Sequence, residues 1–358
     1  MYKHFFIALV SALVAASSQA QTQAPAKKIK YEALTHQNGV ATYKGQPFTG
    51  RAFEMWPDNR IYREIGYVNG LQDGEYFEYN EKSALMAHET WLRGQRNGAY
   101  DYHYLDGAIK SKGTYTRGEL DGLIQGYYAF GGLQYEVNYA LGVRQGWSVT
   151  YYENGAREQE TYFEQGKPHG EVVAYYRDST YRYIRDYEHG IQHGRNYVAH
   201  RSGCPGIEEY YKMGLLDSVR RTYDPMLCAQ IEEGWYSKGK KNGSFYTFGF
   251  FGDTLSIETF SNDALDGWYS KKKEVWEPTL LKNVWEVEEE GQFVSGERDG
   301  YWKHGFVTHY QQREGQYDLG TMVGEWKLYD ADGYLLATQW YDSQGELTKQ
   351  KFHKRKKR

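Results

Sequence analysis

The sequence predicts an all-β protein: an elongated, single-sheet meander of about twelve β-hairpin repeats of 24 residues, twisted or curled along its length. Three observations lead to this prediction. Glycines recur at a step of 24 residues, and aromatic residues recur in phase with them. The composition, with 36 Tyr, 15 Phe and 10 Trp among 358 residues, favours strands over helices. A fixed period of this length is typical of repeat architectures.

The repeat is marked by the motif G-x-x-x-G. Its first position is occupied in chain order by Gln46, Gly70, Gly94, Gly118, Gly142, Gly166, Gly190, Gly214, Gly239, Asp263, Gly296 and Gly320. The second position is glycine in every repeat except one, where Ser218 stands. The step is 24 residues throughout, apart from 25 before Gly239 and 33 before Gly296.

An aromatic residue stands three positions before the first glycine in every repeat. We call this set the ladder column, and its members after the first repeat are Tyr67, Trp91, Tyr115, Tyr139, Phe163, Tyr187, Tyr211, Tyr236, Phe260, Phe293 and Tyr317. Another column, nine positions after the first glycine, holds Tyr79, Tyr127, Tyr151, Tyr175, Tyr223, Phe248 and Tyr329. Side by side, such columns would form continuous stacks of rings between neighbouring hairpins.

Tight turns are predicted next to the glycines. Asp or Asn often precedes the second glycine, as in Asp121-Gly122, and such pairs supply the positive φ angles of hairpin turns. After it the residues alternate, as in 147–151, which indicates a strand. A looser glycine column, which includes Gly155 and Gly203, predicts the turn at the far end of each hairpin.

These columns resemble the MORN repeat, and most closely the bacterial variant found in YwqK-type antitoxin-like proteins. The similarity covers residues 43–345. It implies a β-hairpin array and a binding role, since MORN arrays are known as membrane-lipid binders, dimerising scaffolds and partner-binding rods. It implies no particular partner.

The chain is expected to be organised around this array. Residues 1–20 resemble a signal peptide, because Lys3 and His4 precede a short apolar run and small residues follow at 18–20; an N-terminal anchor helix is the alternative. Residues 21–42 form a lead-in or cap, residues 43–345 the array, and residues 346–358 a basic tail. We expect an exported protein, periplasmic or secreted, with no transmembrane segment.

Nine extra residues lengthen one repeat, at about 268–291. The residues on both sides of Pro278 alternate, which predicts an extended hairpin. It is either a tolerated insertion or a docking finger that presents Trp276 and Trp285. Lys271–Lys273 would face Glu288–Glu290 across it.

The repeat that contains Ser218 is degenerate, because Arg220 and Arg221 replace its usual aromatics, and a kink or weak joint is expected there. Cys204 and Cys228 flank it at the same phase of adjacent repeats. In an oxidising compartment they should form a disulfide. Equivalent strand positions lie about 9–10 Å apart, so the two turns must lean together.

No catalytic motif stands out, and we expect no enzymatic activity and no cofactor. His169 and His193 share a repeat phase and His189 lies nearby, but same-phase residues should be too far apart to share a metal, and no metal site is predicted. A net charge of −4 argues against a nucleic-acid partner.

The expected function is that of an exported, non-enzymatic repeat scaffold that binds a protein partner. The alternative is a surface for a polysaccharide or membrane lipid that uses exposed aromatic rings. The tail residues 351–358 are either solvated or in contact with an anionic lipid or acidic partner.

Overall fold

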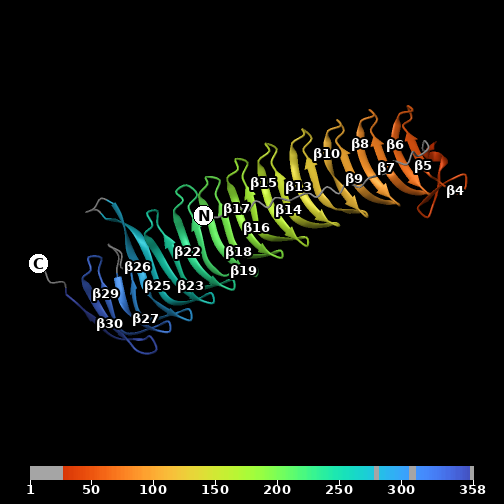
Figure 1. The fold of residues 1–358 in the computed structure, drawn as a ribbon. Helices are drawn as coiled ribbons and strands as arrows, with labels where there is room; N and C mark the ends of the chain where they lie inside the picture. The colour runs from red at the N-terminus through yellow and green to blue at the C-terminus, as the bar shows by residue number, and fades with distance from the viewer. Residues whose placement is uncertain (1–26, 278–281, 306–311, 355–358) are drawn as a thin grey trace, which may run out of the picture. The chain divides into compact units, whose positions relative to one another are not determined.

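The computed structural model describes residues 27–277, 282–305 and 312–354. The predicted signal peptide and residues 355–358 of the tail lie outside these ranges. The chain divides into two parts, residues 1–107 and 108–358, and each is taken by itself (Figure 1). Nowhere in the described ranges is there a helix with the length and apolarity needed to cross a membrane.

The first part begins with a cap. Its elements are β1 (Lys28–Lys30), the 3-10 helix η1 (Tyr31–Ala33), β2 (Thr35–Gln37), β3 (Val40–Tyr43), β4 (Gln46–Pro47), β5 (Gly50–Met55), β6 (Ile61–Val68), β7 (Leu71–Tyr79), β8 (Leu85–Leu92) and β9 (Gln95–His103). Strand β1 pairs in parallel with β5, while β2, β3 and β4 form a small separate sheet. Leu34 and Phe48 are buried against Ile65 and Tyr67. The lead-in therefore covers the first hairpin, which has no preceding repeat to pack on.

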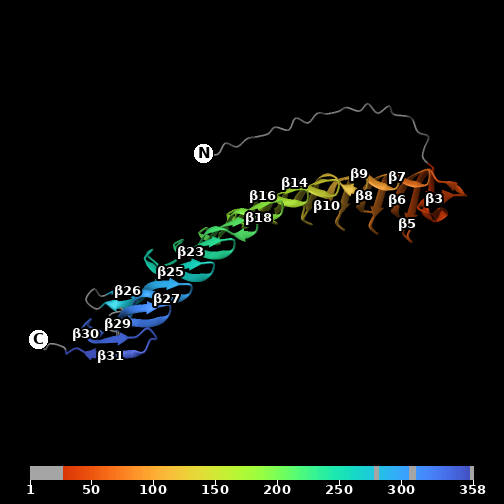
Figure 2. The same cartoon turned by 90° about the horizontal axis from the view of Figure 1, so that it is seen from below.

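The second part is a run of antiparallel hairpins. Its strands are β10 (Ile109–Thr116), β11 (Glu119–Leu120), β12 (Gly122–Tyr127), β13 (Leu133–Ala140), β14 (Val143–Tyr151), β15 (Arg157–Glu164), β16 (Lys167–Tyr175), β17 (Tyr181–Glu188), β18 (Ile191–Ala199), β19 (Pro205–Lys212), β20 (Leu215–Leu216), β21 (Ser218–Tyr223), β22 (Gln230–Ser237), β23 (Lys240–Phe248), β24 (Thr254–Ser261), β25 (Ala264–Glu277), β26 (Lys282–Val294), β27 (Glu297–His304), β28 (Gln312–Asp318), β29 (Thr321–Tyr329), β30 (Leu335–Tyr341) and β31 (Leu347–Phe352). Figures 1 and 2 show these strands side by side in chain order. The prediction of an all-β meander of hairpins is confirmed.

From β6 onward the tight turn of each hairpin lies at the first position of the motif, which corrects the sequence-based placement. Leu141 and Gly142 form a two-residue turn between β13 and β14, with φ of 45° and 80°, as a type I′ turn requires. The second glycine, Gly146, lies inside β14 with φ 94°, near a register shift between Val137 and Tyr139. It therefore serves a bulge in the strand rather than the turn.

The side chain before the second glycine links neighbouring hairpins. The Asp121 carboxylate accepts a hydrogen bond from the Leu141 backbone N–H at 3.3 Å, and the Gln145 side chain does the same for Gln165 at 2.9 Å. The turn glycine also donates to the preceding hairpin, from Gly142 N to the Leu120 carbonyl at 2.7 Å. These bonds explain why Asp and Asn recur at a position that does not form the turn.

The far turns are linked in the same way, at the place that the looser glycine column predicts. Gly155 has φ 82° in the turn after β14. The Tyr152 hydroxyl donates to the Tyr175 carbonyl at 2.8 Å, and the Tyr176 hydroxyl donates to the Ala199 carbonyl at 3.1 Å. In this stretch hydrogen bonds at both ends of a hairpin thus hold it to the next.

Three regions depart from the regular repeat. Strands β25 and β26, with 14 and 13 residues, form the lengthened hairpin, and Lys271 pairs with Glu288 at 3.1 Å. At the degenerate repeat the sheet continues: β21 pairs with β22 over its length, and Ser218 adopts the glycine-like φ of 127°. Asp217 separates β20 from β21, and both short strands pair with β19. The array also continues past residue 345, because β31 pairs with β30. Its Lys349 and Lys351 place charge on a terminal strand, a feature that discourages edge-to-edge pairing.

Candidate functional site

One face of the sheet carries the ladder column, and we call it the ladder face. Each ladder residue lies opposite the residue two positions after the first glycine, as Tyr236 lies opposite Lys241. Two further columns face each other beside it, as Gly234 faces Phe245. The ladder face therefore consists of repeated cross-strand pairs whose members differ from one repeat to the next.

The ladder residues are mostly half-buried. Tyr67 and Tyr317 are buried, and the half-buried members are Trp91, Tyr115, Tyr139, Phe163, Tyr187, Tyr211, Tyr236, Phe260 and Phe293. Cations cover several of these rings. Lys241 Nζ lies 4.5 Å from the centre of the Phe260 ring, and the Arg144 guanidinium lies 5.2 Å from that of Phe163. Such cation–π contacts occupy ring faces that would otherwise be open to a ligand.

The C-terminal repeats form an aromatic block, made of Gly291, Phe293, Trp302, Gly315, Tyr317 and Trp326. Trp302 and Trp326 are fully buried. Each indole lies over a glycine of the neighbouring strand, where a Cβ would overlap the ring. Each Nε1 donates to a backbone carbonyl, at 3.0 Å for Trp302 and 3.1 Å for Trp326. Glycine and tryptophan thus act as a pair.

Repeats nearer the N-terminus, in strands β17 to β21, form a polar block at the same positions of the repeat. It is made of Arg185, Asn196, Glu209 and Arg220. Arg185 Nε donates to the Asn196 side-chain oxygen at 3.1 Å. The buried Glu209 carboxylate accepts from Asn196 at 2.7 Å and from Arg220 Nε at 2.9 Å. Burial and this carboxylate raise the pKa of the neighbouring Tyr211 above its ordinary value. A chain of hydrogen bonds replaces the ring packing.

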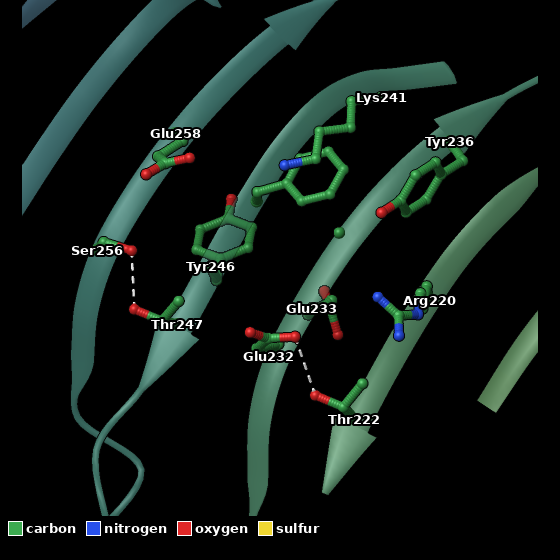
Figure 3. Close-up of a pocket in the computed structure, with 12 residues that line it drawn as sticks. Arg220, Thr222, Glu232, Glu233, Tyr236, Lys241, Tyr246, Thr247, Ser256 and Glu258 are labelled. Atoms are coloured by element: carbon green, nitrogen blue, oxygen red, sulfur yellow. Dashed lines mark hydrogen bonds between the residues drawn. The ribbon is translucent and has the colours of Figure 1, made fainter. Parts of the chain in front are cut away.

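A hollow of about 300 Å³ begins where the polar block ends. It is lined by Arg220, Thr222, Glu232, Glu233, Gly234, Tyr236, Lys241, Phe245, Tyr246, Thr247, Ser256 and Glu258. Figure 3 shows Arg220 and Tyr236 with their polar ends directed toward its middle. In the hollow, Arg220 stands where the next repeat has Phe245, and the Phe245 ring lies over Gly234, where a Cβ would overlap it.

The hollow combines rings with charges of both signs. Lys241 Nζ lies 4.7 Å from the centre of the Phe245 ring. At the other end the Thr222 hydroxyl donates to Glu232 at 3.2 Å, and Thr247 and Ser256 share a hydrogen bond of 2.7 Å (Figure 3). The arrangement can bind a group with both apolar and charged parts. Among the lining residues, no carboxylate is paired with a nucleophile and a base.

The predicted disulfide between Cys204 and Cys228 is present. The two Cα atoms are 5.0 Å apart, well below the spacing of equivalent strand positions. The far turns after β18 and β21 therefore lean together. The Ser202 hydroxyl, which donates to the Pro225 carbonyl at 2.6 Å, draws the same turns together.

The candidate docking finger is described only in part. Trp276 pairs through its backbone with Asn283 in β26, and its side chain lies outside the described atoms. Trp285 is 36% exposed, and its indole lies beside Gly249 in the turn region after β23. Phe250 and Phe251 in that turn are more exposed, at 64% and 88%.

On the opposite face, the second aromatic column forms recurring pairs with glutamates. The Tyr151 hydroxyl donates to Glu136 at 2.9 Å, and that of Tyr329 donates to Glu314 at 2.6 Å. Burial, together with the Glu314 hydrogen bond, raises the pKa of Tyr329 to about 12. These tyrosines therefore have a structural role at the repeat interfaces.

Two histidines and a glutamate lie together near the tight turns. His169 approaches His189, with ring centres 5.0 Å apart, rather than the same-phase His193. Glu164 completes a group whose ligand atoms all lie within 4.8 Å of one another. The sequence analysis missed this group because it compared equivalent positions of adjacent repeats. In the structure the tight turn of one hairpin lies beside the bulge of the preceding hairpin. It also interpreted Arg220 as a sign of a weak joint and missed the hollow.

Comparisons with known proteins give no identification. No protein-family model matches the sequence, and no curated protein matches it. Structurally, 84% of the chain is similar to 22% of a chain in the crystal structure of TcdB2-TccC3-Cdc42, with 10% identity and a TM-score of 0.15. A Photorhabdus luminescens Tc holotoxin pore shows 10% identity over 88% of this chain and 24% of its own, with a TM-score of 0.11. The chain spans about a quarter of their lengths, and likenesses this low carry no argument.

Proposed function

We propose that the protein is an exported, non-enzymatic, MORN-like repeat scaffold that binds a protein partner at the hollow on its ladder face. The composition of the hollow carries this proposal. The half-buried rings of Tyr236 and Phe245 lie beside Arg220, Lys241 and Glu258. Tyrosine and arginine are enriched in the residues that dominate protein–protein binding energy.

A protein side chain fits the hollow better than a sugar does. Sugars stack on open aromatic faces, but in the hollow Lys241 already lies over the Phe245 ring. The volume of about 300 Å³ is at the lower end of the range for small-molecule pockets. An anchoring side chain of a partner, with its charges matched by Lys241 and Glu258, needs no larger space.

The disulfide supports the proposal of export. Disulfides persist in oxidising compartments and are rare in the cytosol. The bond between Cys204 and Cys228 therefore agrees with a periplasmic or secreted protein, as the predicted signal peptide also suggests.

The proposal is tested by site-specific photo-crosslinking in the producing cell. A photoreactive phenylalanine replaces Thr247 in the hollow or, as a control, Trp268, which is 47% exposed and lies on the opposite face. We expect a discrete protein adduct from position 247 alone, identified by mass spectrometry. Equal adducts from both positions, or none from position 247, would contradict a protein-binding hollow.

A matched pair of charge reversals sharpens the test. Lys241→Glu changes the charge in the hollow, whereas Lys240→Glu makes the same change at the exposed neighbouring residue. The adduct should disappear with Lys241→Glu and persist with Lys240→Glu, while both variants keep the circular dichroism of the parent. A glycan array and liposome flotation test the alternative ligands, and binding to either that depends on Lys241 would favour that alternative.

A further inference from the structure

A histidine–glutamate cluster lies at the near turns, away from the hollow. Glu164 is the last residue of β15, His169 lies in β16, and His189 is the first turn residue between β17 and β18. Glu164 Oε2 lies 3.6 Å from His169 Nδ1 and 3.9 Å from His189 Nδ1. The packing of adjacent hairpins brings them together, because the residue before the second glycine meets the first turn residue of the next repeat.

The next repeat provides an internal comparison. There His193 takes the place of His169, and its Nδ1 lies at the same 3.6 Å from Glu188. Met213, however, takes the place of His189. His193 Nδ1 accepts a hydrogen bond from the Met213 backbone N–H at 3.3 Å. By contrast, His169 Nδ1 is buried and has no hydrogen-bond partner among the described residues. The first cluster thus has an unsatisfied nitrogen, and the cluster's ligand atoms all lie within 4.8 Å of one another.

We propose that Glu164, His169 and His189 bind a first-row divalent transition metal, for which Zn²⁺ is the probe. Two imidazoles and one carboxylate suit Zn²⁺, Ni²⁺ or Cu²⁺ rather than Mg²⁺ or Ca²⁺. Tetrahedral Zn²⁺ with bonds near 2.0–2.1 Å needs ligand atoms about 3.3 Å apart. The side chains of Glu164 and His189 are 42% and 65% exposed, so rotation can bring them to that distance. The fourth position stays open to water. This site does not depend on the proposed protein partner.

Calorimetric titration of the full chain, stripped of metal by a chelator, tests the proposal. We expect one Zn²⁺ per chain. His169→Ala should weaken binding about 10–100-fold or more, since even outer-shell changes cost that much. His189→Asn should do the same, and Asn suits the positive φ of 48° at this turn. His193→Ala is the matched control and should leave the affinity unchanged.

A gain of binding completes the test. Met213→His supplies the missing imidazole to Glu188 and His193, and it should raise the stoichiometry from one Zn²⁺ to two. Co²⁺ should give the intense visible absorption of a tetrahedral site in the parent and lose it in His169→Ala. The proposal is overturned if the parent binds no Zn²⁺, if His169→Ala and His189→Asn bind as the parent does, or if His193→Ala weakens binding equally. A Met213→His variant that still binds one equivalent would overturn the three-ligand arrangement.

Discussion

The aromatic block and the polar block use the same backbone for opposite chemistry. In the aromatic block a glycine pairs with a buried indole, as Gly315 does with Trp326, eleven residues later. In the polar block the same spacing joins Glu209 to Arg220. Turn hydrogen bonds recur in both, such as Gly214 N to the Gln192 carbonyl and Gly320 N to the Arg298 carbonyl. The turns thus define the period, while the facing pairs on the ladder face determine local stability.

The two blocks should therefore fail for different reasons. The aromatic block depends on apolar burial, since Trp302 and Trp326 are fully buried. The polar block depends on satisfied hydrogen bonds around Glu209, and a disulfide joins the turns at its edge. In a repeat array each repeat contacts its neighbours, so a change in one block should spread little to the other. The predictions below test this separation.

The largest effect is expected in the aromatic block. Trp326→Ala removes a fully buried indole and should cost about 3–5 kcal/mol of local unfolding free energy. Hydrogen exchange of amides in β27 to β30 measures this loss, since a long array need not unfold in two states. Trp268→Ala, at a half-exposed indole, is the control and should change little. Equal losses in both variants would contradict a core beneath Trp326.

The disulfide should have the next largest effect, confined to the polar block. Replacing Cys204 and Cys228 together by alanine opens a loop of 24 residues and should cost about 2–4 kcal/mol. Amide exchange in β18 to β22 should accelerate, and exchange in β27 to β30 should not. Acceleration of the same size in both regions would show that the blocks unfold as one unit.

Glu209→Ala should weaken the polar block by a smaller amount. It leaves Asn196 and Arg220 without their acceptor, at a cost of about 2–3 kcal/mol. Glu171→Ala, at an exposed carboxylate two repeats earlier, controls for the change in net charge. The same exchange measurement over β18 to β22 reports the effect. If Glu209→Ala behaves as Glu171→Ala does, the hydrogen-bond chain adds nothing to stability.

The period and the fold class could be predicted from sequence because both follow from residues that recur. The first glycine takes a positive φ in a turn, and the ladder residue precedes it at a fixed offset of three positions. The position of the tight turn could not be predicted from the sequence. Asp121-Gly122 has the composition of a turn, but Asp121 accepts a hydrogen bond from the next hairpin instead. Only the packing of neighbouring repeats separates the two roles.

The candidate site was less accessible to sequence reasoning because it results from a mismatch between columns. The hollow needs Gly234 beside Phe245 in one repeat and Arg220 in the previous one. Each of these residues has an ordinary local explanation in the sequence, and only the strand register shows that they line one hollow. The disulfide was predictable, since Cys204 and Cys228 share a phase, but the leaning of their turns depends on side-chain contacts such as that of Ser202.

The smallest effect is a pH dependence of the aromatic block. His304 stacks on Trp302 and Trp326, at 5.5 and 6.1 Å between ring centres. Burial, with Arg313 and Arg298 nearby, lowers the pKa of His304 below its ordinary value of 6.5, although Glu289 opposes this shift. As pH falls, the unfolded chain binds the proton first, so stability is present above pH 6.5 and declines below it.

Hydrogen exchange in β27 to β30, compared at about pH 7.5 and pH 5.5 after correction for the intrinsic exchange rate, measures this decline. His304→Gln should reduce the difference between the two conditions. His189→Asn, which changes an exposed histidine of another repeat, should leave it as in the parent. The polar block consists of Arg185, Asn196, Glu209 and Arg220 and contains no histidine. The part of the pH difference that depends on His304 should therefore be absent from it. If His304→Gln keeps the full difference, the imidazole is not the group that couples this block to pH.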